Sequence, residues 1–140
     1  NIDKCKCLHF GHSNIKHNYS IGDSIIQTVS EERDLGVIIH QSLNASTHCA
    51  KAVKSAFRAL GLINRTITNK DKTTIIRLYK ELVRPHLDYC VQVWRPHLQR
   101  DIDLIERVQK RALRMIGGLS HLDCVYRLTV PNNACVDLLF

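Results

Sequence analysis

Apolar residues follow two different spacings along this chain, and the change falls near Asn44. Before that point, three stretches of strand length are rich in β-branched and other apolar side chains: residues 4–10, 24–29 and 35–40. The charged residues 30–34 are expected to form the turn between the last two stretches. After Asn44, apolar residues recur at the spacing of amphipathic helices. The pattern predicts an α+β fold, with a small antiparallel sheet over residues 4–40 and a bundle of about four helices over residues 46–116.

The longest predicted helix covers residues 46–66 and has two distinct faces. Its apolar side chains fall on one side: Cys49, Val53, Ala56, Phe57, Leu60 and Ile63. At about 100° per residue, a second set of side chains points within about 60° of one another. This set is basic and consists of Lys51, Lys54, Arg58 and Arg65. We therefore expect a basic ridge opposite an apolar floor.

A second helix is predicted from a cap at Asn69 or Asp71 to about Arg84, where Pro85 breaks it or opens the next. Its buried stripe is expected to be Ile75, Leu78, Tyr79 and Leu82. Its other face carries Arg77, Lys80 and Arg84.

Two further helices complete the predicted bundle. A short one ends before Pro96 and places on one stripe Leu87, Cys90, Val91 and Trp94. The last covers residues 100–116, where Asp101 and Asp103 favour its positive end and Gly117–Gly118 forms its exit. Its inward face is expected to be Ile102, Ile105, Val108, Ala112 and Met115.

Composition is that of one folded domain or two small lobes, with 44% hydrophobic residues in 140. The sequence has no long uncharged apolar stretch, so no membrane span is expected. It begins at Asn1 and its only methionine is Met115, which suggests a fragment of a longer protein. Six scattered cysteines lack the spacing of a disulfide framework. Reduced thiols predict an intracellular location, nuclear or cytoplasmic.

Positive charge is concentrated in one part of the sequence. The formal net charge is +7, but no aspartate or glutamate occurs from Leu35 to Lys70. Basic helical faces hold phosphate backbones without reading sequence. The simpler interpretation, a solvated helix face, suits the later helices, whose basic faces also carry acids. For the acid-free helix over residues 46–66 we favour nucleic-acid binding.

Five short motifs follow one another in a fixed order. They are Asn1-x-x-Lys4-Cys5, Asp34-Leu35-Gly36-Val37, Leu78-Tyr79-Lys80-x-Leu82-Val83-x-Pro85, Leu87-x-Tyr89-Cys90-x-x-x-Trp94 and Ile105-Glu106-x-Val108-Gln109-x-Arg111. In this order the chain resembles the C-terminal part of a LINE-type (non-LTR) retrotransposon reverse transcriptase, over residues 1–122. In that family the two aspartates that bind catalytic Mg²⁺ lie upstream, in a Tyr/Phe-Ala-Asp-Asp box. This sequence contains no such box.

The resemblance implies a division of the chain and a role for its parts. Residues 1–44 would be the end of the palm with a primer-grip-like hairpin, residues 45–122 a helical thumb-like region, and residues 123–140 an irregular tail. Leu35 and Gly36 match the primer grip, where glycine lets backbone approach the primer end. Nucleic-acid contacts are then expected from Lys51, Lys54, Arg58, Arg65, Lys70, Arg77, Lys80 and Arg84.

The partners implied are an RNA or DNA primer-template and the missing upstream palm and fingers. Lys4 matches a palm lysine thought to protonate departing pyrophosphate, but without the aspartates it has no reaction to assist. Mg²⁺ belongs to the parent polymerase family, and no cofactor is expected in this chain, which alone should not polymerise. Two alternatives remain open: a stand-alone basic RNA- or DNA-binding module, and an inactive relic of a retrotransposon.

Two smaller features have competing explanations. Cys5-x-Cys7-x-His9-x-x-His12 contains zinc-ligand types but lacks a second ligand pair at standard spacing, so packed cysteines are preferred and no metal site is predicted. Three aromatic residues could stack on bases: Tyr79, Tyr89 and Trp94. Their positions on apolar helical stripes predict core residues instead.

Overall fold

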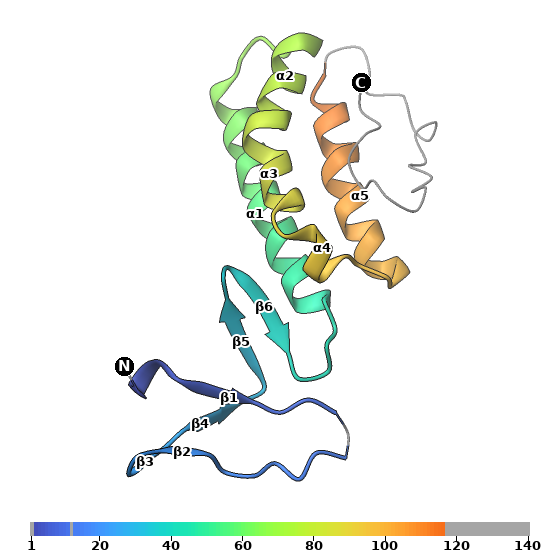
Figure 1. Cartoon of the computed structure of the whole chain (residues 1–140). Helices are drawn as coiled ribbons and strands as arrows, with labels where there is room; N and C mark the ends of the chain where they lie inside the picture. Colours follow the sequence, from blue (N-terminus) through green and yellow to red (C-terminus); the bar gives the residue numbers. More distant parts are fainter. Residues whose placement is uncertain (1, 12, 117–140) are drawn as a thin grey trace.

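The computed structural model describes residues 2–11 and 13–116, and it confirms the predicted α+β fold. The helices gather at one end of the molecule and the β-strands at the other (Figure 1). A 3₁₀ turn, Ile2–Lys4, precedes six short strands: β1 (Lys6–Leu8), β2 (Ser20–Ile21), β3 (Ser24–Ile25), β4 (Gln27–Val29), β5 (Glu31–Asp34) and β6 (Val37–His40). The expected exit at residues 117–118 and the tail at residues 123–140 lie outside the described residues.

The strands form three separate pairs. β2–β3 and β5–β6 are antiparallel, as expected, whereas β1 and β4 run parallel. The parallel pair is possible because the chain between β1 and β4 is long enough to return in the same direction. Most of the segment 30–34, expected to be a turn, is instead strand β5. All four residues of β5 are exposed, so no apolar alternation indicated a strand there.

The helical region begins with α1 (Ser46–Thr66), whose bounds match the prediction. The chain then forms α2 (Lys72–Leu78), a π-helical turn (Tyr79–Val83), α3 (Arg84–Asp88), α4 (Val91–Trp94) and α5 (Gln99–Arg114). The Asp71 carboxylate caps α2 by accepting a hydrogen bond from the Thr74 N–H at 2.9 Å. Pro85 lies in the first turn of α3 and so opens that helix, which is one of the two expected outcomes.

The π turn changes which residues face the core. The buried side chains recur every fourth residue, at Ile75, Tyr79, Val83 and Leu87. In an α-helix such a spacing drifts around the axis by about 40° at each step, and the wider π turn compensates for this drift. Leu82, expected to be buried, is therefore 45% exposed, and Val83 takes its place.

The predicted short helix over residues 87–94 is divided in two. Cys90 adopts a left-handed conformation with φ of 52° and separates α3 from α4. This bend leaves the Tyr89 carbonyl free to accept a hydrogen bond from the Trp94 indole N–H at 2.7 Å. Leu87 and Trp94 are both buried, so the apolar stripe reaches the core despite the break.

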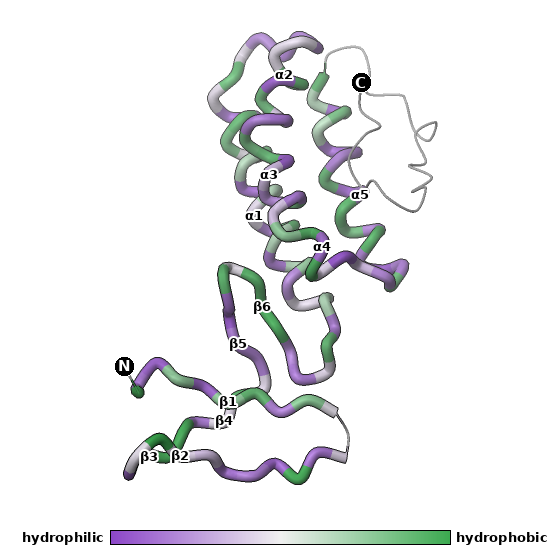
Figure 2. Tube along the Cα trace, in the orientation of Figure 1, coloured by the Kyte–Doolittle hydropathy of each residue, from purple (hydrophilic) through white to green (hydrophobic). Residues whose placement is uncertain are grey.

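The core lies where α1 meets α5, the π turn and α3. α1 contributes the largest share of it through Cys49, Ala52, Val53, Ala56, Leu60 and Ile63. From α5 come Ile105, Val108 and Ala112. β6 joins this core through Val37, and Figure 2 shows that β6 is hydrophobic whereas β5 is hydrophilic. The hairpin thus contributes to the apolar core through β6 and not through β5.

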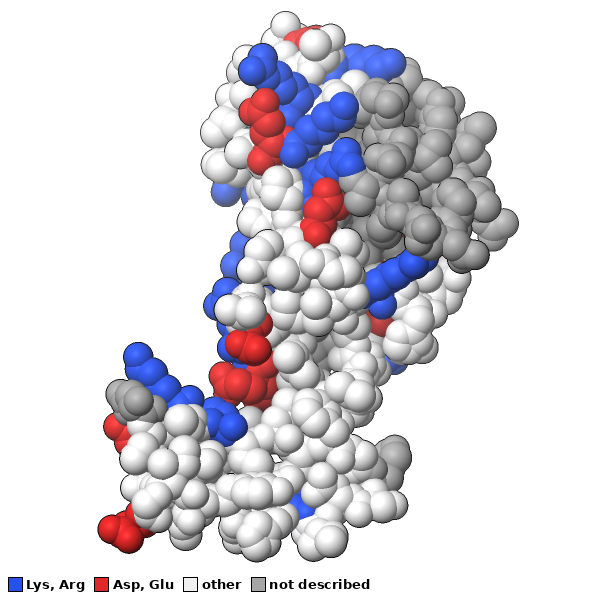
Figure 3. All heavy atoms as spheres, in the orientation of Figure 1, with Lys and Arg blue, Asp and Glu red and all other residues white. Residues whose placement is uncertain are grey.

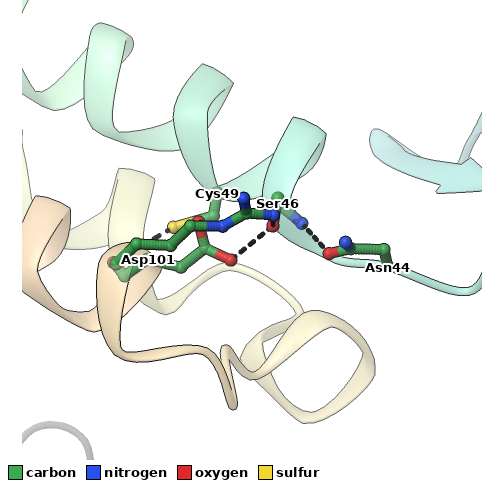
Figure 4. Close-up of polar contacts among 5 residues, drawn as sticks. Asn44, Ser46, Cys49 and Asp101 are labelled. Carbon is green, nitrogen blue, oxygen red and sulfur yellow. Dashed lines mark hydrogen bonds and ion pairs between the residues drawn. The ribbon is translucent and has the colours of Figure 1, made fainter.

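A polar network around the buried Asp101 joins the first turns of α1 and α5 (Figure 4). Ser46 donates its hydroxyl hydrogen to the Asp101 carboxylate at 2.5 Å and accepts from Arg100 at 3.2 Å. The Cys49 thiol donates to the Asp101 carbonyl oxygen at 3.5 Å, and the Asn44 side-chain oxygen accepts from the Ser46 N–H at 2.9 Å. Asp101 is only 3% exposed. Its position reflects this inter-helix contact as well as the helix-end electrostatics expected from the sequence.

We expect Asp101→Asn to lower the free energy of unfolding by about 1.5–3 kcal/mol, because it removes the charge from a buried hydrogen bond. Asp103→Asn is the matched control, since that carboxylate accepts an exposed hydrogen bond from Gln99. Urea denaturation of both variants provides the measurement. Equal stability of the two variants would contradict a structural role for the network.

Candidate nucleic-acid interface

Four cations of α1 occupy its exposed side. Lys51, Lys54, Arg58 and Arg65 are all exposed, while the opposite side of α1 is buried. Within the described part of the chain, none of the four forms an ion pair with an acidic side chain. Figure 3 shows blue side chains along the edge of the helical region where α1 lies. We call these four residues the α1 ridge.

The other predicted contacts have a different electrostatic setting. Arg77 pairs with Glu81 at 3.1 Å, and Arg84 pairs with Asp88 at 3.0 Å. Lys70 donates to the Asn64 side-chain oxygen at 2.6 Å, and Lys80 is exposed. The two arginines are thus partly neutralised by their own helix, which weakens their attraction for phosphate. The structure therefore separates the eight candidate cations into the unpaired α1 ridge and a mixed set beyond it.

The β5–β6 hairpin turns at Leu35 and Gly36, the two residues that resemble a primer grip. Asp34 pairs with Val37, so these two residues form the whole loop. Both have positive φ, 45° for Leu35 and 88° for Gly36, as a tight hairpin turn with type I′ twist requires. A leucine in this conformation is uncommon. The Leu35 side chain is also 82% exposed, so an apolar group stands at the tip of the hairpin.

Tyr89 joins this tip to the helical region. Its hydroxyl donates to the Leu35 carbonyl oxygen at 2.8 Å. Its ring lies against Gly36, where an added Cβ would come within 3.2 Å of a ring carbon. Tyr89 was expected in the core, but it is 55% exposed. The amphipathic ring covers the hairpin while its hydroxyl reaches a backbone acceptor. Tyr79 and Trp94 are buried, as expected.

His48 joins the stem of the same hairpin to α1. Its Nδ1 accepts a hydrogen bond from the Ile38 N–H at 3.1 Å, which requires a neutral ring with the proton on Nε2. Its ring lies 4.9 Å from the Trp94 ring, between centroids. Burial, followed by the nearby charges of Lys51 and Arg33, lowers the pKa of His48. His48 was not identified from the sequence, because an isolated histidine on an apolar face carries no motif.

Charges on β5 limit where a phosphate backbone could lie. Glu31, Glu32 and Asp34 are exposed on this strand, and Figure 3 shows red side chains near the blue edge. Arg33 is exposed on the same strand and is close enough to His48 to affect its pKa. Sequence reasoning did not single out Arg33, because the segment was expected to be a charged turn. A polyanion would be repelled from most of β5 and attracted to α1.

The N-terminal candidates lie apart from these contacts. Lys4 is exposed at the end of the 3₁₀ turn. The Cys7 sulfur is 3.6 Å from His9 Nε2, while His12 lies outside the described residues. In residues 2–11 and 13–116, no three side chains of histidine, cysteine, aspartate or glutamate come together as metal ligands would. None of the described helices has both the length and the apolar character needed to cross a membrane.

Sequence comparison supports a relation to retrotransposon reverse transcriptases. The chain is similar to the RNA-directed DNA polymerase from mobile element jockey of Drosophila funebris, with 26% identity over 102 residues. The match covers 71% of this chain and 11% of that polymerase, so the chain spans a small part of its relative. No protein-family model matches the chain, and neither does any solved structure.

We expect Gly36→Ala to lower the free energy of unfolding by about 1–3 kcal/mol, because alanine is strained at this positive φ and meets the Tyr89 ring. Gly22→Ala is the matched control, since Gly22 also has positive φ but no atom lies within 4 Å of an added Cβ. Chemical denaturation compares the two. A cost no larger at Gly36 than at Gly22 would show that the contact with Tyr89 is loose.

The lowered pKa of His48 predicts a pH-dependent stability. The unfolded chain, in which the histidine pKa is about 6.5, takes up the proton more readily than the folded chain. The contribution of neutral His48 to the free energy of unfolding is therefore complete above about pH 6.5, and it is lost as the pH falls toward the folded-state pKa. Urea midpoints measured from about pH 7.5 to about pH 5 should fall more steeply for the wild type than for His48→Asn, which keeps a neutral acceptor. Parallel curves would contradict this explanation.

Proposed function

We propose that this chain is a thumb-like part of a retrotransposon reverse transcriptase and that it holds the primer-template during DNA synthesis. The observation that carries the proposal is the unpaired α1 ridge, in a chain with sequence similarity to such a polymerase. A polymerase moves along its template and needs a hold that ignores base sequence. Contacts between cations and phosphates provide that hold.

The length of the ridge suits this role. From Lys51 to Arg65 the helix advances by about 21 Å at about 1.5 Å per residue, which is long enough to follow several phosphates of one strand. The apolar floor of α1 is buried, so the helix is fixed and its cations point outward without rearrangement. A prearranged ridge reduces the ordering cost of binding.

The hairpin tip supports the same role. Leu35 presents an exposed apolar side chain at the tip, next to Gly36, and resemblance to a primer grip gives this tip a target, the primer end. The acids of β5 lie behind the tip. We infer that nucleic acid follows α1 and meets the hairpin at Leu35 and Gly36 only.

Exposed apolar side chains in residues 2–25 support the proposal that this chain is part of a larger protein. Large apolar side chains are exposed in this part of the chain, namely Ile2, Phe10, Ile15, Tyr19, Ile21 and Ile25. An upstream palm with fingers would cover such surface in the assembled polymerase. Mg²⁺-dependent nucleotide addition belongs there in this proposal, because the aspartate box of the resembled family does not occur in this sequence. Lys4 would stand beside that upstream site.

The test replaces the α1 ridge. The purified chain should bind primer-template duplex weakly, with affinity that falls as salt increases. Replacing all four ridge residues by glutamine should abolish most binding and reduce the slope of log affinity against log salt by about 0.9 for each phosphate that the chain no longer neutralises. Fluorescence anisotropy at several salt concentrations measures both quantities.

The matched control changes the same net charge elsewhere. Arg77, Arg84, Arg100 and Lys110 each pair with an acidic side chain. Their replacement by glutamine should weaken binding much less than replacement of the ridge. Equal losses of affinity in both variants would indicate a general charge effect and would remove α1 as the binding surface.

A further inference from the structure

Tyr89 belongs to a chain of contacts that ties the hairpin to the helices at two points. At the tip, its hydroxyl donates to Leu35; at the stem, His48 accepts from the Ile38 N–H. Trp94 connects the two points, since its indole donates to the Tyr89 carbonyl oxygen and its ring lies against His48. A two-stranded hairpin alone is only marginally stable in water. These contacts therefore determine where its tip lies relative to α1.

The exposure of Tyr89 distinguishes it from the other two aromatic residues in the predicted set. Tyr79 and Trp94 are buried and contribute to packing, whereas half of Tyr89 remains open to solvent. The contact at Gly36 is close, because a Cβ added there would lie 3.2 Å from a carbon of the Tyr89 ring and the ring would have to shift. The left-handed Cys90 that follows directs the chain away, so that Tyr89 stands at the end of α3 beside the hairpin.

We propose that Tyr89 is a positioning residue that holds the Leu35–Gly36 tip at a fixed place beside the α1 ridge, so that one duplex contacts both. This proposal rests on the proposed function and adds the residue that aligns its two parts. The Tyr89 hydroxyl acts through Leu35 and carries no charge, so its removal should weaken binding without changing how many phosphates the chain neutralises.

The first experiment tests positioning without nucleic acid. Tyr89→Phe removes a single oxygen and keeps the ring against Gly36, so the variant should fold. Hydrogen exchange of backbone amides at residues 33–38 should become several-fold faster, while exchange in α1 stays unchanged. Tyr19→Phe is the matched control, because Tyr19 is similarly exposed. Unchanged exchange at the hairpin in Tyr89→Phe would overturn the positioning role, whether or not the chain binds nucleic acid.

The second experiment uses primer-template duplex and a double-mutant cycle. Tyr89→Phe should weaken binding about threefold to tenfold, with an unchanged salt slope. Leu35→Asn keeps a residue that tolerates positive φ and should weaken binding to a similar degree. The double variant should bind no more weakly than either single variant, because both changes remove the same interaction between tip and duplex.

Lys54→Gln serves as the reference in this cycle. Its effect should multiply with that of Tyr89→Phe, and it should lower the salt slope. If the affinity losses of Tyr89→Phe and Leu35→Asn multiply in the double variant, the positioning role of Tyr89 is contradicted. The proposal that the α1 ridge binds nucleic acid is not affected by that result. If the wild type does not bind the duplex at all, the proposed function is overturned. The proposed alignment of the hairpin tip and the ridge on a duplex is then overturned as well.

Discussion

Burial of one side of α1 is the constraint on which the rest of this structure depends. α5, the π turn, α3 and β6 all pack against α1, and its side chains form the largest share of the core. Since that side is occupied, the remaining positions must face solvent, and these positions carry Lys51, Lys54, Arg58 and Arg65. The same packing that folds the chain therefore also fixes the direction in which these four cations point.

Contacts between segments far apart in the sequence attach the hairpin and α5 to the rest of the helical region. The bonds from Tyr89 to Leu35 and from Ser46 to Asp101 join residues 54 and 55 positions apart. Each lies at an end of an element, where local structure changes: the hairpin turn, the left-handed residue after α3, and the first turns of α1 and α5. Polar contacts thus hold the ends of helices and of the hairpin in position, whereas apolar packing holds the central parts of the helices together.

Local periodicity was enough to predict α1, its buried face and the buried stripe of α5, because these depend on residues within a few positions of one another. Capping preference limited the start of α2 to Asn69 or Asp71, and the structure has Asp71. It failed at β5, which has no buried face, and at Leu82, where the π turn shifts the register. Tyr89 and His48 could not be predicted as partners of the hairpin, since their roles depend on contacts that exist only after the chain has folded. Among the candidate site residues, the sequence indicated the ridge, and the acids on the later helices already favoured a solvated face there; the structure shows that these acids pair with Arg77 and Arg84 at i,i+4 spacing.

The central claim is that the exposed side of α1 lies along a nucleic-acid backbone, and lysine reactivity tests it directly. The chain is acetylated briefly with and without a primer-template duplex, and modification is located by mass spectrometry. We expect the duplex to protect Lys51 and Lys54, while Lys110 on α5 and Lys6 on β1 keep their reactivity. Protection spread evenly over all four lysines, or confined to Lys110 and Lys6, would contradict the claim.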